Sequence, residues 1–293
     1  MLRKRLEWIF GDRRLFLGER TLIVGILNVT PDSFSDGGLH PDPDRAYARA
    51  LQLEEQGADV IDIVAESTRP GSTRISEAEE LRRLIPVLKR LRGKLNILIS
   101  VDTYKSGVAK QALRYGAEII NDSSGLTFDP QLARVVASQN AGLILNHMRG
   151  TPETWSRLPP MRDVMGGILA DLEAALHRAR RAGVERGRVM VDPGLGFGKR
   201  KEQNAEILAR LAEMAKLDLP ILTGPSRKSF LQMETEEGTR FATAAAVTAS
   251  ILNGAHAVRV HDVAEMSAVA AVADAFLRSR EEHQASARES GPS

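Results

Sequence analysis

The chain of 293 residues contains no cysteine, which excludes disulfide scaffolds, thiolate metal sites and cysteine nucleophiles. Aromatic residues are scarce, at 4%, and no apolar run reaches the 18 residues expected of a membrane span. The 40 Lys and Arg residues nearly balance the 38 Asp and Glu residues, so no strong basic excess favours nucleic-acid binding. Glu7, Gly11 and Asp12 interrupt any apolar signal region near the N-terminus. We expect a cytoplasmic protein without a membrane or nucleic-acid partner.

Short apolar stretches rich in β-branched residues alternate with longer segments of helical periodicity. Such continuous apolar stretches are typical of parallel strands, which are buried on both faces of a sheet. They are residues 21–27, 59–63, 96–101, 118–120, 142–145, 189–191, 219–222 and 255–260. The pattern predicts an α/β fold, a single (β/α)8 TIM barrel with its active site at the carboxyl ends of the strands.

A polar residue or a glycine stands at or just past the end of each stretch. These residues are Asn28, Asp62, Asp102, Asn121, His147, Asp192, Gly224 and Arg259. In a (β/α)8 barrel all strand carboxyl ends meet at one face, so we expect these side chains to converge there. The competing fold, a doubly wound sheet, would place polar residues mainly at its topological switch point.

We expect residues 1–293 to form one barrel domain. Gly11 and Asp12, between apolar stretches, predict a small hairpin within residues 1–20 that closes the bottom of the barrel. The polar end of the chain, residues 285–293, contains Gly and Pro and predicts a disordered tail.

Basic residues follow the last two predicted strands. Phosphate sites in such barrels frequently use the loops after strands seven and eight. Lys228 supplies a point charge and Arg259 a bidentate fork, a combination suited to phosphate or diphosphate. We interpret Arg227 as a solvated surface residue. A Schiff-base role for Lys228 is a weaker alternative, because nothing in the sequence indicates a depressed pKa.

Three carboxylates and one amide leave four different predicted strands. Asp62, Asp102, Asp192 and Asn121 would converge in an apolar barrel mouth, where carboxylates need hydrogen-bond donors to offset desolvation. A ligand with paired N–H donors, such as the 2-amino pyrimidinone edge of a pterin or a guanine, would supply them. Metal ligation and pairing with backbone amides are the alternatives.

Two further features have weaker signals. Residues 194–199 superficially resemble a phosphate-binding loop, but Arg200 stands where that motif needs a metal-binding Ser or Thr. His147 is as compatible with a core or hydrogen-bonding role as with catalysis. Neither feature therefore assigns a function.

Segments distributed over residues 21–273 together resemble the dihydropteroate synthase family of the folate pathway. They are residues 26–38, 66–71, 100–103, 120–122, 192–199, 226–229 and 259–262. The resemblance implies a (β/α)8 barrel transferase that condenses 6-hydroxymethyl-7,8-dihydropterin diphosphate with p-aminobenzoate, giving 7,8-dihydropteroate and diphosphate. It implies dissociative loss of diphosphate before attack by the amine. It also implies Mg²⁺ as cofactor, small-molecule substrates as partners, and a homodimer.

The resemblance assigns roles to matching positions. Pterin binding falls to Asp102, Asn121, Asp192 and Lys228. Diphosphate binding falls to Asn28, Thr68, Arg69, Arg259 and His261, with Asn28 also holding the metal. Pro70, Phe197, Ser226 and Lys228 would contact p-aminobenzoate. The catalytic set implied is Asn28, Thr68, Arg69, Asp102, Lys228, Arg259 and His261.

The chain departs from the family pattern at two places. Val64 and Ala65 stand where the family usually has Gly-Gly, and Pro225 replaces a residue that is often Met or another apolar side chain. Neither change removes a polar group. The first departure motivates one alternative, a pterin-binding module without catalysis. A third hypothesis, a pterin methyltransferase that serves a corrinoid protein, would not need the full set of anion-binding residues.

Overall fold

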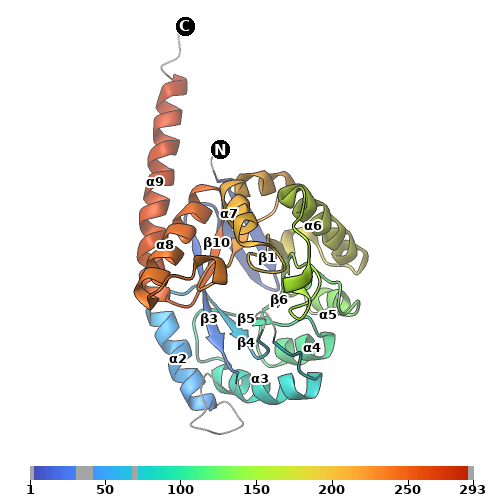
Figure 1. Cartoon of the computed structure of the whole chain (residues 1–293). Helices are drawn as coiled ribbons and strands as arrows, with labels where there is room; N and C mark the ends of the chain where they lie inside the picture. The colour runs from blue at the N-terminus through green and yellow to red at the C-terminus, as the bar shows by residue number, and fades with distance from the viewer. Residues whose placement is uncertain (1–2, 31–41, 68–71, 290–293) are drawn as a thin grey trace.

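A barrel of parallel strands forms the centre of the computed structural model, which describes residues 3–30, 42–67 and 72–289 (Figure 1). The strands are β3 (Leu22–Asn28), β4 (Val60–Val64), β5 (Leu98–Asp102), β6 (Ile119–Asp122), β7 (Gly142–Asn146), β8 (Val189–Asp192), β9 (Leu222–Thr223) and β10 (Ala257–Val260). They form one 8-stranded sheet in the order β8-β7-β6-β5-β4-β3-β10-β9. A parallel bridge between Val191 and Ile221 joins the two ends of this sheet. The predicted (β/α)8 barrel is therefore confirmed.

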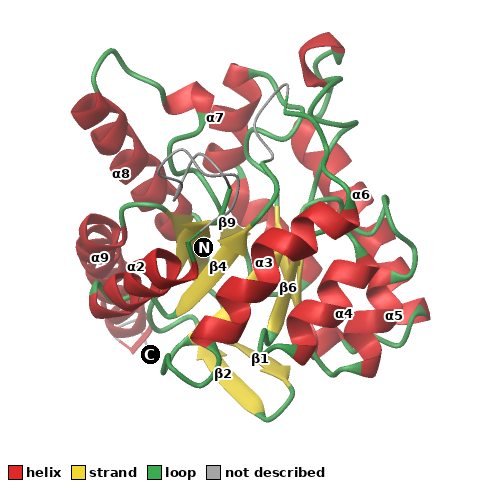
Figure 2. Cartoon of the chain, turned by 90° about the horizontal axis from the view of Figure 1, so that it is seen from below, coloured by secondary structure: helices red, strands yellow, loops and turns green. Residues whose placement is uncertain are grey.

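Helices surround the barrel on its outer side (Figure 2). They are α2 (Pro43–Glu55), α3 (Glu77–Leu91), α4 (Ser106–Arg114), α5 (Leu132–Ser138), α6 (Val164–Arg181), α7 (Lys201–Ala209), α8 (Glu236–Leu252) and α9 (Val263–Glu289). Short 3-10 turns are η1 (Trp155–Arg157), η2 (Arg186–Arg188), η3 (Leu211–Leu217) and η4 (Ser229–Leu231). Among the described helices, none is long and apolar enough to span a bilayer.

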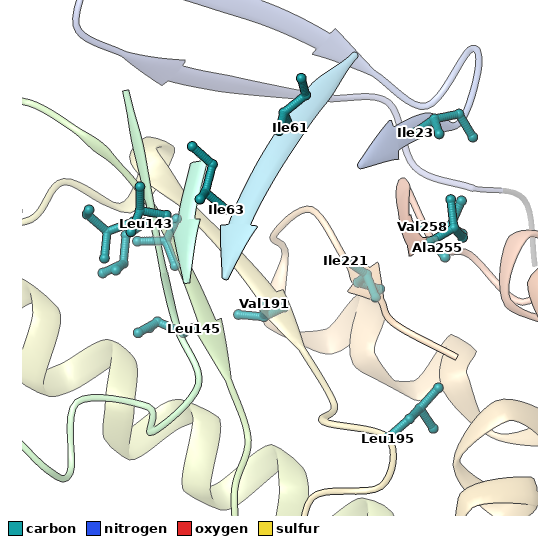
Figure 3. Close-up of a cluster of buried hydrophobic side chains, with 14 of the residues drawn as sticks. Ile23, Ile61, Ile63, Leu143, Leu145, Val191, Leu195, Ile221, Ala255 and Val258 are labelled. Carbon is teal, nitrogen blue, oxygen red and sulfur yellow. The ribbon is translucent and has the colours of Figure 1, made fainter. Parts of the chain in front are cut away.

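Alternation along each strand sends side chains to two different apolar layers. In β4, Ile61 and Ile63 point outward and join the core between the strands and the helices, which Figure 3 shows in part. Val60 points inward and joins the floor of the barrel. The floor consists of Leu22, Val24, Val60, Leu98, Ile119, Ile144, Met190, Leu222 and Ala257, together with residues of the N-terminal hairpin.

The predicted hairpin closes the amino end of the barrel. Strands β1 (Leu6–Phe10) and β2 (Arg13–Leu17) pair antiparallel. Trp8, Phe10 and Leu17 are almost fully buried against the floor. With its amino end filled by apolar side chains, the barrel interior is left open for chemistry only at the carboxyl ends of the strands.

The inward positions directly above the apolar floor are mostly polar. Each lies two residues after a floor residue on its strand: Asp62, Ser100, Asn121, Asn146, Asp192 and Arg259. Because side chains repeat on one face with a period of two residues, these six share the interior of the barrel. This polar layer positions the candidate site.

The C-terminal helix extends into the segment for which the sequence predicted a disordered tail. Helix α9 continues to Glu289, so the prediction of a disordered tail is wrong for residues 285–289. Residues 281–289 include three Glu, two Ala, one Gln and one Arg, all good helix formers, and contain neither Gly nor Pro, so nothing in them stops a helix. The Gly and Pro that suggested disorder stand later, among residues 290–293, which lie outside the described residues.

Candidate active site

An ionic network joins four strands across the barrel mouth. The Asp62 carboxylate on β4 accepts hydrogen bonds from Arg259 Nε on β10, at 2.6 Å, and from Asn121 Nδ2 on β6, at 3.1 Å. Arg259 Nη2 also donates to Asp102 on β5, at 3.1 Å. The polar residues that follow distant strands are therefore in direct contact, as the sequence predicted.

The site contains more carboxylate acceptors than protein donors. One guanidinium group serves both Asp62 and Asp102, and burial raises the pKa of Asp102 to about 7 despite the attraction of Arg259. Within the described part of the chain, Asp62 Oδ1 and Asn146 Oδ1 are buried without a hydrogen-bond partner. Buried acceptors in this state are costly unless a ligand or water supplies N–H or O–H groups. The arrangement suits a ligand that carries several donors.

Asp192 adds a third carboxylate at the end of β8. Its Oδ1 atom accepts a hydrogen bond from the backbone N–H of Gly194, at 2.6 Å. Burial raises the pKa of Asp192 to about 6, although this hydrogen bond and the charge of Lys228 oppose the shift. Asp192 is therefore ionised at neutral pH and can accept further hydrogen bonds.

Lys228 brings a cation into the same mouth. Burial, and then the charge of Arg259, lowers the pKa of Lys228 to about 8, while Asp192 and Asp102 oppose this shift. Our sequence interpretation found no reason for a depressed pKa and is wrong here, because the reason is enclosure in the folded barrel. The ammonium group lies 4.1 Å from the centroid of the Phe197 ring, a cation–π contact.

Ser226 and His261 form a hydrogen-bonded pair beside these charges. The Ser226 hydroxyl oxygen accepts from the backbone N–H of His261, at 3.2 Å, and lies 3.0 Å from His261 Nδ1. Burial, with the charge of Arg259, lowers the pKa of His261 to about 3. His261 is thus neutral at physiological pH and offers an anion a hydrogen bond without a positive charge.

Of the remaining predicted site residues, the structure describes Asn28 and Phe197 but not Thr68, Arg69 and Pro70. Asn28 ends β3 at the same rim and is half-buried. Phe197 packs edge-on against Trp155, with ring centroids 5.3 Å apart. Thr68, Arg69 and Pro70 lie outside the described residues, so their roles stay predictions.

Two other candidates have structural partners away from the network. Arg227 pairs with Asp262 through hydrogen bonds of 3.1 and 2.5 Å, in keeping with its interpretation as a surface residue. His147 is buried with Nε2 3.0 Å from Asp171, and burial lowers the pKa of His147 to about 4. These contacts favour the hydrogen-bonding role of His147 over catalysis.

Sequence reasoning gave no final role to Asp62 or Asn146, although both lie in the polar layer. For Asp62 the signal was present in the sequence. It lies two residues after Val60 on β4, so the two side chains share the inward face of the strand. For Asn146, the last residue of β7, the sequence analysis instead chose the next residue, His147, as the polar residue that follows this strand.

The sequence of this chain is similar to one protein family along most of its length. The model of the family described as "Pterin binding enzyme" matches residues 24–261. The chain is 44% identical over 266 residues to a dihydropteroate synthase of Synechocystis sp., covering 89% of this chain and 92% of that protein. It is 42% identical over 263 residues to a dihydropteroate synthase of Bacillus subtilis, with 88% and 90% covered.

Solved structures give the same result. A dihydropteroate synthase from Clostridium difficile, crystallised in the presence of pteroic acid, superposes with a TM-score of 0.84 at 42% identity and covers 89% of this chain and 98% of its own. A Xanthomonas albilineans dihydropteroate synthase with 4-aminobenzoic acid gives a TM-score of 0.85 at 38% identity, with 93% and 98% covered.

Proposed function

This chain belongs to the family of pterin-binding enzymes, and from that premise we propose that it is a transferase of the dihydropteroate synthase type. It condenses 6-hydroxymethyl-7,8-dihydropterin diphosphate with p-aminobenzoate to give 7,8-dihydropteroate and diphosphate. The observation that carries the proposal is the network at the barrel mouth, where Asp62, Asp102, Asn121 and Asp192 present acceptors beside the cations Lys228 and Arg259.

The acceptors suit the pterin half of the substrate. A pterin carries an exocyclic amine and ring N–H groups, which would donate to Asp102 and Asp192. Asn121 donates from Nδ2 to Asp62, so its Oδ1 atom is the side available to accept from a ligand. This orientation supports binding of a donor-rich heterocycle at the centre of the mouth.

The cations suit the diphosphate half. Arg259 and Lys228 offer positive charge, and neutral His261 offers an N–H donor. Such fixed donors stabilise charge that develops on a leaving group. We propose the same role for Thr68 and Arg69, which the resemblance assigns to diphosphate.

The proposed chemistry needs no nucleophilic side chain. The bond between the pterin methylene carbon and the diphosphate oxygen breaks, and its electron pair leaves with diphosphate. The methylene cation is stabilised by the pterin ring and by the carboxylates of Asp102 and Asp192. The amine of p-aminobenzoate, which we place beside Phe197, Ser226, Lys228 and Pro70, forms the new C–N bond and releases one proton to solvent.

We propose Mg²⁺ as the cofactor. Among the described residues no three His, Asp or Glu side chains cluster as a metal site, so these residues do not fit a metal ion coordinated by protein side chains alone. The fit is instead a site in which the amide oxygen of Asn28 at the rim would be completed by substrate phosphates and water, since Mg²⁺ prefers oxygen ligands and keeps several waters. When bound, the ion would offset negative charge on the departing diphosphate.

Turnover with purified protein tests the proposal. The protein is mixed with p-aminobenzoate, the pterin diphosphate and Mg²⁺, and we expect release of diphosphate in equal amount to dihydropteroate. A folded protein that binds the pterin yet forms no product would overturn the enzymatic assignment in favour of a binding module. Omitting Mg²⁺, or adding a chelator, should reduce the rate sharply.

We also propose a homodimer in a cytoplasmic setting. Phe241 on α8 and Val272 and Phe276 on α9 are exposed apolar side chains on two helices that pack together, and such side chains commonly mark an interface. Light scattering should give twice the chain mass of 32.0 kDa for the native protein. Phe276→Lys should shift it to one chain mass, while Phe16→Lys, an exposed control on the hairpin, should not. Cell fractionation tests the location.

A further inference from the structure

The loops that follow β7 and β8 meet at the ammonium group of Lys199. Lys199 Nζ donates hydrogen bonds to the backbone carbonyl oxygens of Gly194 at 2.6 Å, Pro193 at 2.8 Å and His147 at 2.9 Å. The described residues place no carboxylate in an ion pair with it. Lys199 is therefore bound by carbonyl dipoles from two separate loops, much as a small monovalent cation would be.

The local backbone is shaped for this contact. Gly194, Gly196 and Gly198 all have left-handed φ angles, of 70°, 80° and 73°. A Cβ atom at Gly194 would lie 1.8 Å from the His147 carbonyl oxygen and 2.8 Å from Lys199 Nζ. Only glycine at this position allows the two loops to approach so closely. Burial lowers the pKa of Lys199 well below its usual value, and the charge of Asp192 opposes this shift. The three carbonyl acceptors also favour the charged form, because only that form of lysine has three N–H donors.

The loop after β8, which contains Gly194, Gly196 and Phe197, contacts three groups of the active site. Its Gly194 N–H orients the Asp192 carboxylate, at 2.6 Å. Its Phe197 ring lies against the Lys228 ammonium group, at 4.1 Å. A Cβ atom at Gly196 would lie 3.1 Å from Lys228 Cδ, so the loop backbone itself confines that side chain.

From these contacts we infer that Lys199 is a positioning residue, which holds the loops after β7 and β8 together and thereby fixes Asp192, Phe197 and Lys228 for the reaction. It touches neither substrate nor reacting atoms in this scheme. A displacement of about 1 Å at a catalytic group can reduce a rate by about 100-fold, so loss of the ammonium group should be visible in catalysis. The catalytic part of this inference rests on the proposed function.

The test compares Lys199→Ala with Lys199→Met and with Lys201→Ala, an exposed lysine at the start of α7. We expect kcat/KM for the pterin diphosphate to fall by about 100-fold in both Lys199 variants and to stay within twofold in the control. Methylammonium or ethylammonium ions should restore part of the activity to Lys199→Ala, where space is left. They should not restore it to Lys199→Met, whose side chain fills that space.

Two readouts do not depend on turnover. Trp155 donates to the Arg149 carbonyl at 2.7 Å and packs on Phe197, so its fluorescence reports the arrangement of these loops. We expect a red shift of the emission in Lys199→Ala, reversed by methylammonium, and weaker pteroate binding by calorimetry. If the wild type binds pteroate but does not turn over, the proposed function fails while these two measurements still test Lys199.

The inference is overturned by either of two results. The first is wild-type kinetics, emission and pteroate binding in Lys199→Ala. The second is a loss of activity that alkylammonium ions do not reverse, together with unchanged Trp155 emission, which would show that the loops keep their arrangement without the ammonium group. Should Lys199→Ala fail to fold, Lys199→Met provides the kinetic and fluorescence comparison, and an alkylammonium-dependent recovery of folded Lys199→Ala would itself support the inference.

Discussion

Two arginines that pair with buried carboxylates, the buried Arg3 at the amino end of the barrel and the partly buried Arg259 at the rim, have different environments. At the amino end, Arg3 donates to the Gly18 carbonyl at 3.0 Å, to Thr21 Oγ1 at 2.7 Å, to the Ala255 carbonyl at 3.1 Å and to Asp274 at 2.9 Å. Asp274 also accepts from the Thr21 backbone N–H at 2.7 Å and from its hydroxyl at 2.8 Å. One cation meets one carboxylate, and the protein supplies partners for both.

At the rim, Arg259 faces two carboxylates, and Asp62 Oδ1 has no hydrogen-bond partner in the described part of the chain. A complete network stabilises a fold, whereas an incomplete one costs stability until a ligand completes it. The comparison teaches that burial of charge alone does not identify a site. A site is identified instead by buried acceptor atoms that lack a donor, such as Asp62 Oδ1. Substitutions at the rim and at the amino end of the barrel can test this difference.

The largest effect is expected at the rim. Arg259→Met should reduce kcat/KM by about 1,000-fold, or about 4 kcal/mol, because it removes a fixed donor to the leaving diphosphate. The variant should fold with reduced stability, because among the described residues the buried Asp62 keeps only the hydrogen bond from Asn121, while Asp102, with a pKa of about 7, can take up a proton. Steady-state kinetics and circular dichroism check this, and a wild-type kcat/KM would remove Arg259 from the mechanism.

The opposite outcome is expected at the amino end. Arg3→Ala should lower the free energy of unfolding by about 3 kcal/mol, because it leaves Asp274 buried without its cation. The kcat/KM of the folded fraction should not change. Denaturant titration measures the loss, with Arg5→Ala as the control, since Arg5 forms an exposed pair with Glu19 that contributes little. A change in kcat/KM at 25 °C would show that the two ends are coupled.

The rim should also be sensitive to pH. The Asp102 pKa is raised to about 7, so below that value its carboxyl becomes neutral and loses acceptor capacity. The Lys228 pKa is lowered to about 8, so above that value its charge is lost. We therefore expect kcat/KM for the pterin diphosphate to be highest between about pH 7 and pH 8. It should fall about tenfold per pH unit below and above that range.

The variant Asp102→Asn sharpens that test. It removes the group assigned to the acid limb, so the residual activity should decline only near the Asp192 pKa of about 6. An acid limb that stays near 7 in this variant would assign the titration to another group.

The smallest effect is expected at Val64. This side chain faces the barrel mouth, in register with Asn28 and Asp102 on the neighbouring strands. Val64→Gly should change kcat/KM by less than fivefold, because no polar contact is lost. It should cost about 2 kcal/mol of stability, from the lost burial of the valine and from a glycine inside a strand. A gain in kcat/KM above tenfold would instead show that the valine restricts substrate entry.

The barrel and the position of its site were predictable because both follow from local patterns. Apolar stretches with polar exits specify parallel strands, and parallel strands bring their ends together. Asn28, Asp102, Asn121 and Asp192 were found this way. Val60 and Asp62 show the limit of the method, since alternation places both inward but does not say which partners they meet.

Properties that depend on the packing of distant segments were not predictable. The depressed pKa of Lys228 comes from enclosure and from Arg259, which is 31 positions away in the sequence. The contact of Lys199 with the His147 carbonyl joins two loops that no local motif connects. The disordered tail was predicted too early in the chain because one Gly and one Pro, at positions 291 and 292, outweighed the helix formers before them.

The direction of α9 has a practical consequence for handling the protein. The helix follows β10 at the rim, and its C-terminal part projects beyond the other helices of the molecule (Figure 1). The C-terminal end of α9 therefore lies apart from the body of the molecule (Figure 1). A label or surface anchor attached through this helix would leave substrate diffusion unobstructed, so immobilised protein is suited to biosensor measurements of pterin and benzoate binding.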